Sequence, residues 1–160
     1  MDYTCHYDSA LGGITLASDG EALTGLWFDG QKYFADTLDA EHEEQPLPVF
    51  DEAVRWLDLY FGGEVPDFTP ELSPRGSAFR RRVWDALLAI PYGHTTTYGE
   101  IAKKLGCKSA QAVGGAVGHN PISLIIPCHR VLGADGSLTG YAGGTDKKRR
   151  LLEIEQSVKK

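Results

Sequence analysis

The two halves of this 160-residue chain carry opposite charge, and this reversal strongly constrains how the chain can fold. Residues 1–70 hold 2 Lys or Arg against 15 Asp or Glu, a net charge of -13, whereas residues 71–160 hold 14 against 7, a net charge of +7. Three prolines, Pro66, Pro70 and Pro74, lie where the sign changes, which is typical of a linker. We therefore expect two domains, the second of which can meet a polyanion; a solvated basic face is the alternative that charge alone leaves open.

Composition excludes several classes of protein. Hydrophobic residues make up 42% and charged residues 24% of the chain, the balance of a soluble globular protein rather than a disordered one. No run reaches the roughly 18 apolar residues of a transmembrane helix, and the N-terminus lacks the basic and apolar regions of a signal peptide. Cys5, Cys107 and Cys128 form no CxxC pair, which argues against a disulfide framework and a zinc site. We expect a cytoplasmic protein that needs no metal, cofactor or membrane.

The acidic half has the pattern of a small sheet followed by a helix. Alternating segments at 3–7, 14–17 and 23–28 are separated by glycine-containing turns, which predicts an antiparallel meander. Residues 29–48 are polar and predict at most a short helix and then a loop. Phe50, Val54, Leu57 and Phe61 recur at helical spacing before two glycines and predict an amphipathic helix.

The basic half is predicted to be mainly helical. Apolar residues at helical spacing predict a helix from about Ser77 to Ile90, which Pro91 ends. Thr97 and Glu100 form a capping box for a second helix, and Ser109 can cap a third that runs to about Gly118. Two helices this close, with a glycine between them, have the spacing of a helix-turn-helix. Thr145 or Asp146 can cap a last helix, whose four successive cations, Lys147 to Arg150, oppose the helix dipole.

The third of these helices is rich in small residues. Each interior glycine costs roughly 0.5–1 kcal/mol relative to alanine, so the sequence of residues 110–118, AQAVGGAVG, needs a reason. One reason is that small side chains let a nucleic-acid strand come close. Tight packing against another helix explains the pattern equally well.

A candidate nucleophile follows at residues 120–130, NPISLIIPCHR. The apolar run between Ile122 and Ile126 stops at a proline and predicts a short buried strand or extended segment. Cys128 comes next, beside His129 and Arg130, either of which can lower the pKa of a thiol. The alternative is a structural cysteine, because free cysteines are among the most buried residues.

The region from Phe79 to Glu155 resembles the O6-alkylguanine-DNA alkyltransferases, proteins that repair DNA and are consumed by the reaction. The resemblance rests on five motifs in a specific order: 97–102 (TYGEIA), 112–116 (AVGGA), 120–121 (NP), 127–131 (PCHRV) and 140–144 (GYAGG). The N-terminal half is similar to the family's variable domain, with a weaker match at 59–64 (LYFGGE). The resemblance implies an α/β domain over 1–72, with an antiparallel sheet plus helix of ribonuclease-H-like fold. A mainly α, winged-helix-like domain with a helix-turn-helix is implied over 77–160.

The resemblance also implies roles for individual residues. Cys128 matches the nucleophile that accepts and keeps the alkyl group. His129 matches the base that acts on it through a water, and Glu155 matches the carboxylate that orients the histidine. Asn120 matches the residue that braces the active-site segment. The residues implied for the substrate pocket are Val117, Val131, Tyr141 and Ala142.

The remaining implied roles concern double-stranded DNA. Tyr98, followed by Gly99, matches the tyrosine that helps the target nucleotide rotate out of the duplex, because an alkylated base must leave the stack before a sulfur can attack it. Residues 110–118 match a recognition helix that enters the minor groove, and Arg80 is expected to hold phosphate. One position departs from the family: Gln111 stands where an arginine usually enters the base stack. This puts the extrusion step in doubt, and we expect weaker flipping.

The sequence therefore predicts a monomeric protein that moves the alkyl group of O6-alkylguanine in DNA to Cys128, once and irreversibly. O4-alkylthymine is left open as a second substrate. One alternative is an alkyltransferase-like protein that binds lesions without reacting, but such relatives lack the cysteine. Another is a cysteine hydrolase with a Cys-His-Glu triad, which would not need a basic helix-turn-helix.

Overall fold

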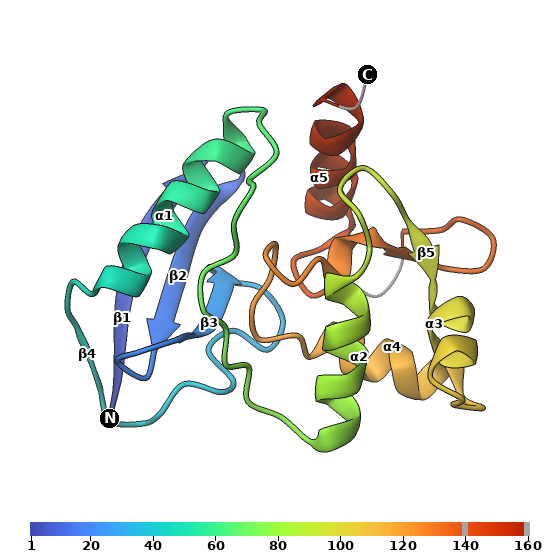
Figure 1. The fold of residues 1–160 in the computed structure, drawn as a ribbon, viewed down its shortest axis with the longest axis horizontal. Helices are drawn as coiled ribbons and strands as arrows, with labels where there is room; N and C mark the ends of the chain where they lie inside the picture. The colour runs from blue at the N-terminus through green and yellow to red at the C-terminus, as the bar shows by residue number, and fades with distance from the viewer. Residues whose placement is uncertain (139–140, 159–160) are drawn as a thin grey trace. The chain divides into compact units, whose positions relative to one another are not determined.

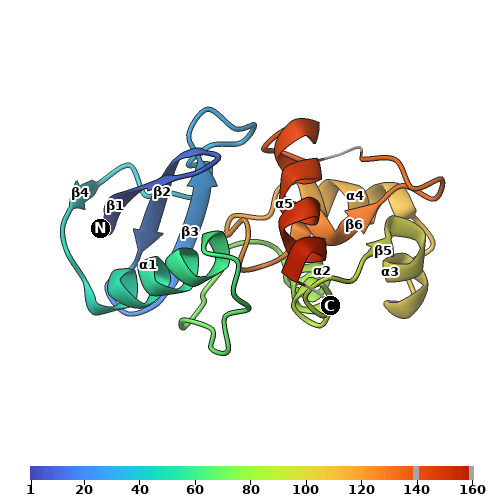
Figure 2. The ribbon, with the colours of Figure 1, turned by 90° about the horizontal axis from the view of Figure 1, so that it is seen from above.

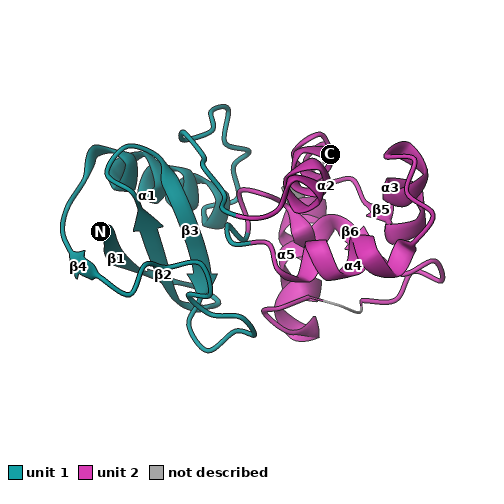
Figure 3. Cartoon of the chain, turned by 90° about the horizontal axis from the view of Figure 1, so that it is seen from below, with its two compact units in different colours: residues 1–75, 121–123 teal, residues 76–120, 124–160 magenta. Residues whose placement is uncertain are grey.

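The computed structural model describes residues 1–138 and 141–158, and its internal contacts divide the chain into two compact units (Figure 3). Unit 1 contains residues 1–75 together with 121–123, and unit 2 contains 76–120 and 124–160. The sequence did not indicate that residues 121–123 group with the first unit. Among the helices of the described residues, none is both long and apolar enough to cross a membrane.

Unit 1 is built on a four-stranded sheet with the strand order β3-β2-β1-β4 (Figure 1). The strands β1 (Asp2–Ser9), β2 (Gly12–Ser18) and β3 (Leu23–Phe28) pair antiparallel, which confirms the predicted meander. The fourth strand, β4 (His42–Glu44), was not predicted and pairs parallel with β1, so the sheet is mixed. Its three residues are all exposed and polar, and they carry no alternating pattern that sequence analysis could detect.

The predicted amphipathic helix is α1 (Pro48–Phe61), which lies along one face of the sheet (Figure 2). Pro48 suits the first turn, where its missing N–H is not needed, and Gly63 has a φ of +85° just after the helix. The helix contacts β1, β2 and β3. The buried residues that it contributes are Val49, Phe50, Ala53, Trp56, Leu57 and Tyr60.

Residues 121–123 extend unit 1 beside β3. The Leu26 N–H donates to the Pro121 carbonyl at 2.8 Å, and the Ser123 N–H donates to the Leu26 carbonyl at 2.9 Å. Ile122 therefore forms an isolated parallel bridge with Leu26. These two hydrogen bonds hold the start of the segment that carries the candidate nucleophile.

Unit 2 contains the predicted helix-turn-helix. Its elements are α2 (Ala78–Leu88), β5 (Thr96–Thr97), α3 (Tyr98–Lys104), α4 (Ala110–Gly118), the 3-10 helix η1 (Cys128–Arg130), β6 (Val131–Leu132) and α5 (Thr145–Val158). Helix α4 packs against α2 and α3, and the Trp84 indole N–H donates to the Ala116 carbonyl at 2.8 Å. The parallel pair β5–β6 completes a mainly helical, winged-helix-like unit.

Side-chain caps begin three of these helices, as their sequences indicate. The hydroxyls of Ser77, Thr97 and Ser109 each accept a hydrogen bond from the backbone N–H three residues later, at 3.0–3.2 Å. Gly106 ends α3 with a φ of +67°, a conformation that costs glycine little. Local rules of helix capping thus set the ends of the elements that surround the site.

The prediction of a strand between Ile122 and Ile126 is wrong. After the bridge at Ile122 the chain turns, and Leu124 adopts a φ of +71° although it is fully buried and is not glycine. Cys128 then begins a 3-10 helix rather than an extended segment. The prediction failed because the apolar run reflects burial, and burial alone does not distinguish a strand from a buried turn.

Candidate functional site

Cys128 lies in the interior of unit 2, at the first residue of η1, with 4% of its surface exposed. The segment before it is held by Asn120, whose side-chain amide donates to the Ile126 carbonyl at 2.8 Å. The same amide also forms a hydrogen bond with the Cys128 thiol. Asn120 is itself buried, so one side chain determines both where the segment lies and what the sulfur contacts.

The surroundings of this thiol oppose its ionisation. Burial raises the pKa of Cys128 to about 11, although the Asn120 amide, the Lys148 ammonium and two backbone N–H groups act to lower it. The sequence suggested that His129 or Arg130 would provide the activating charge. Neither is among the main groups that lower the pKa of the thiol, because both are bound to another residue. At neutral pH the resting sulfur is therefore a thiol.

His129 and Arg130 both bind the carboxylate of Glu155, which lies on α5. The His129 Nε2 lies 2.5 Å from Glu155 Oε2, and the Arg130 Nε donates to Oε1 at 2.8 Å. Arg130 also donates to Oε2 at 3.2 Å and to the Ile90 carbonyl at 2.8 Å. The Gly93 N–H donates to Oε1 at 3.2 Å. The predicted pairing of His129 with Glu155 is thus present in the structure, and Arg130 and Gly93 are partners that the sequence did not indicate.

The charges in this cluster follow from its burial. Burial alone would raise the pKa of Glu155, but hydrogen bonds from His129 and Arg130 outweigh it and lower the pKa to about 2. Burial also lowers the pKa of His129, so its ring is neutral near pH 7. A neutral ring that donates from Nε2 to a carboxylate has Nδ1 as its basic nitrogen.

Lys148 is a component of the site that sequence analysis did not identify. Its side chain is fully buried, and its Nζ lies 5.8 Å from the centroid of the Tyr98 ring. Burial lowers the pKa of Lys148 to about 8, with Cys128 acting in the opposite direction. The sequence did carry a signal, because Lys147 to Arg150 stand at a helix start where cations are unfavourable. That signal did not tell which of the four side chains would turn inward.

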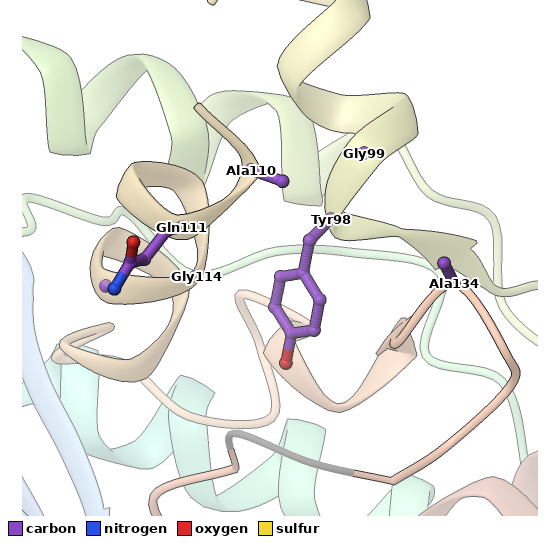
Figure 4. Close-up of a pocket in the computed structure, with 7 residues that line it drawn as sticks. Tyr98, Gly99, Ala110, Gln111, Gly114 and Ala134 are labelled. Carbon is purple, nitrogen blue, oxygen red and sulfur yellow. The ribbon is translucent and has the colours of Figure 1, made fainter. Parts of the chain in front are cut away.

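A cavity of about 720 Å³ lies beside α3 and α4 (Figure 4). Tyr98 projects into it from the start of α3, and burial followed by the proximity of Cys128 raises the pKa of its phenol. Three of the predicted DNA-binding residues, Tyr98, Gly99 and Gln111, line this cavity together. The other lining residues are Ala110, Gly114, Gly115 and Ala134.

Two glycines of α4, Gly114 and Gly115, are not needed for packing inside the protein. A methyl group on Gly115 would meet no heavy atom within 4 Å, and one on Gly114 would meet only the Tyr98 ring, at 3.9 Å. Both positions line the cavity, and Gly115 is exposed. Of the two explanations for the small residues, tight helix packing is therefore not supported at these positions. Close approach by a ligand is the explanation that the structure favours.

The other predicted residues are not among those that line this cavity. Arg80 is half-buried in the first turn of α2. Val117, Val131 and Tyr141 are buried, and Ala142 is half-buried. Gly140 of the GYAGG motif lies outside the described residues. In residues 1–138 and 141–158, no three His, Cys, Asp or Glu side chains are grouped so that they could hold a metal ion.

A helix-turn-helix unit that encloses a cysteine, next to a histidine bound to a carboxylate, defines a DNA-binding protein with thiol chemistry. Two models of known protein families match this chain. The model of the 6-O-methylguanine DNA methyltransferase DNA-binding domain matches residues 78–157, and that of the ribonuclease-like domain of the same proteins matches residues 3–74. The chain belongs to the 6-O-methylguanine DNA methyltransferase family.

Individual relatives are similar in sequence to this chain over nearly its whole length. The methylated-DNA--protein-cysteine methyltransferase of Mycobacterium tuberculosis is 50% identical over 156 residues, which cover 95% of this chain and 93% of the relative. The protein of that name from Haemophilus influenzae is 44% identical and covers 96% and 86%. The crystal structure of M. tuberculosis OGT in complex with DNA has a TM-score of 0.87 and 48% identity, over 98% of this chain and 93% of that one.

The buried cluster predicts how stability depends on pH. His129 stays neutral in the folded state, so its contribution is present above the unfolded pKa near 6.5 and is lost as the pH falls below it. Glu155 is ionised down to about pH 2, so its contribution, on the order of 3 kcal/mol, is lost between about pH 4.5 and pH 2. We expect Glu155→Gln to lower the free energy of unfolding at pH 7, and the deficit to shrink towards pH 2.

Urea unfolding at pH 7, 5 and 3 measures this difference. Glu153→Gln is the matched control, because Glu153 lies on the same helix and is exposed. A deficit for Glu155→Gln that stays constant with pH would contradict the assignment of a low pKa to Glu155.

Proposed function

We propose that this protein repairs DNA by transferring the alkyl group of O6-alkylguanine directly to Cys128. The observation that carries the proposal is a buried thiol beside the His129–Glu155 pair, in the same unit as a helix whose glycines face an open cavity. The names of the relatives agree with it, because they act on methylated DNA and a protein cysteine. Alkylated bases in double-stranded DNA are the partner that this geometry fits.

The burial of Cys128 requires the base to leave the duplex. In B-DNA the O6 atom of guanine lies on the major-groove edge of a stacked pair, where a sulfur that is 4% exposed cannot align behind an alkyl carbon. Rotating the nucleotide out costs a few kcal/mol, and less when the pair is damaged. We assign Tyr98 to this step because its ring projects into the cavity and its phenol lies close enough to Cys128 to be affected electrostatically.

The transfer itself is a displacement at the alkyl carbon. The thiol proton passes to Nδ1 of His129, through one water, and the sulfur forms a bond to the carbon as the bond from that carbon to O6 breaks. The guanine leaves with the bonding electrons and takes up a proton. Glu155 holds the imidazole through Nε2, and its own low pKa keeps it from taking the proton. Asn120 fixes the nucleophile by bracing Ile126.

The product explains why we expect a single turnover. Alkylated Cys128 is a thioether, which is a poor leaving group, so the protein is consumed. We also propose that it acts as a monomer, because every residue named in the mechanism belongs to unit 2 of one chain. Free Cys5, Cys107 and Cys128 suit the reducing cytoplasm, which is our proposed location.

Reaction with a duplex that contains one O6-methylguanine tests this function. We expect intact-protein mass spectrometry to show one added methyl group, and peptide mapping to place it on Cys128. Cys128→Ser should stay unmodified, whereas Cys107→Ser, the matched control at a half-buried cysteine, should react like the unchanged protein. Repeated turnover, or a methyl group on another residue, would refute the proposal.

The substitution Gly115→Ala should raise the stability of the protein while it weakens DNA binding. Because a methyl group at this position meets nothing inside the protein, helix propensity favours alanine by about 0.5–1 kcal/mol. We expect a higher free energy of unfolding in urea but weaker binding to duplex DNA, measured by fluorescence anisotropy at fixed salt. Val65→Ala, a small uncharged change at an exposed position that does not line the cavity, is the control for DNA binding. Unchanged affinity in Gly115→Ala would show that this helix face does not approach DNA.

Gln111→Arg should speed the reaction on duplex DNA. An arginine at this cavity-lining position is longer than glutamine and can occupy the space that the flipped nucleotide leaves. We expect a severalfold higher single-turnover rate with a methylated duplex, and no change with free O6-methylguanine base, which needs no extrusion. An unchanged rate on the duplex would show that Gln111 does not limit flipping.

A further inference from the structure

The turn between α2 and β5, residues 91–94, has a conformation that depends on glycine. The His94 N–H donates to the Pro91 carbonyl at 3.1 Å, which closes the turn. Gly93, its third residue, has a φ of +78°, the value that a type II turn places there and that glycine adopts at little cost. The closing hydrogen bond does not use the N–H and C=O groups of Gly93, so these groups can bind residues outside the turn.

Two consecutive residues of α5 bind the two backbone groups of Gly93. The N–H donates to Glu155 Oε1 at 3.2 Å, and the carbonyl accepts from the side-chain amide of Gln156 at 2.8 Å. Arg130 of η1 binds the chain just before the turn, because it donates to the Ile90 carbonyl at 2.8 Å. The turn is therefore held from both η1 and α5. The proposed mechanism gives no role to Gln156.

The chain that leaves this turn leads directly to Tyr98. It first forms β5, which pairs with β6 so that Thr96 lies opposite Val131 and Thr97 opposite Leu132. Helix α3 begins at the next residue, which is Tyr98. Strand β6 in turn begins at the residue that follows η1. The segment that carries Tyr98 is thus joined to the helix of the nucleophile at two places, the β5–β6 pair and the turn.

The β5–β6 pair is too short to fix Tyr98 without the turn. It contains only two residue pairs, and a two-stranded sheet of any length is marginally stable by itself. The chain before β5 must therefore be held if the Tyr98 ring is to keep a constant position relative to Cys128. Such positions matter, because a displacement of about 1 Å caused by a distant mutation can lower a rate by about 100-fold.

We propose that Gln156 is a positioning residue: together with Glu155 it holds the turn at Gly93, and the turn fixes where the Tyr98 ring lies relative to Cys128. Glu155 also orients the base of the proposed mechanism, so neighbouring residues of α5 align the base and the ring assigned to extrusion. The role of the ring in extrusion rests on the proposed function, whereas its placement by Gln156 does not.

Fluorine NMR follows the placement of the ring without DNA. We would label the folded full-length protein with fluorotyrosine and assign the Tyr98 signal with Tyr98→Phe. Gln156→Leu, which has a similar size but no hydrogen-bond donor, should shift or broaden this signal. Gln156→Lys, which keeps a donor, should leave it close to that of the unchanged protein. Gln45→Leu, the same change at an exposed position of unit 1, is the matched control and should not move it.

Single-turnover methyl transfer at saturating duplex is the second measurement. In Gln156→Leu we expect a limiting rate about fivefold lower, because the step assigned to Tyr98 follows binding, and an unchanged affinity for the duplex. Gln156→Lys should restore most of the rate. A merely structural role for Gln156 would lower the free energy of unfolding in urea without moving the Tyr98 signal or the limiting rate, and that result would overturn the inference.

The two measurements distinguish this inference from the proposed function. If the Tyr98 signal moves in Gln156→Leu but the unchanged protein takes no methyl group from DNA, the proposed function fails and the placement of Tyr98 by Gln156 stands. If the unchanged protein takes the methyl group and Gln156→Leu does so at the same limiting rate, the proposed function stands and the positioning role is wrong.

Discussion

The carboxylate of Glu155 is the interaction on which the rest of the site depends. It binds three groups that are distant in sequence: the backbone N–H of Gly93, the imidazole of His129 and the guanidinium of Arg130. Two of these are adjacent residues of η1, so one side chain on α5 fixes the short helix that also carries the nucleophile. Removing the carboxylate would leave a buried guanidinium unpaired and an imidazole without a fixed tautomer, a loss of orientation as well as of stability.

The electrostatics of the resting site favour a protein that stays unreactive until DNA binds. Burial outweighs every favourable contact of the Cys128 thiol, and its pKa of about 11 leaves few thiolates at neutral pH. Compensating groups are nevertheless in place, in the Asn120 amide and the Lys148 ammonium. Because both groups are buried beside the sulfur, little reorganisation is needed when charge develops on it. A base that excludes water would further strengthen their effect.

The parts of this structure that could be predicted from sequence obey local rules, and the rest depends on tertiary contacts. Thr97 and Ser109 cap helices as predicted, because a cap involves residues only three apart. The positive φ of Leu124 and the strand β4 depend on distant partners and leave no periodic signal. The resemblance to the alkyltransferase family implied the pairing of His129 with Glu155. Neither that resemblance nor the residue pattern of the sequence indicated that Arg130 binds the same carboxylate. Nor could helical spacing show that Lys148, alone among four successive cations, is fully buried.

The proposed function divides recognition between a surface and an interior. The minor groove distinguishes base pairs poorly, so a small-residue helix that approaches it can bind duplexes of any sequence. Gly114 and Gly115 fit this task, since they offer close approach and no side chains for reading bases. Selectivity for damage must then arise after binding, from the lower cost of flipping a weakened pair and from alignment with Cys128. Such a division suits a lesion that can occur in any sequence, and it leaves Gln111, at the boundary between surface and interior, as the residue that couples the two steps.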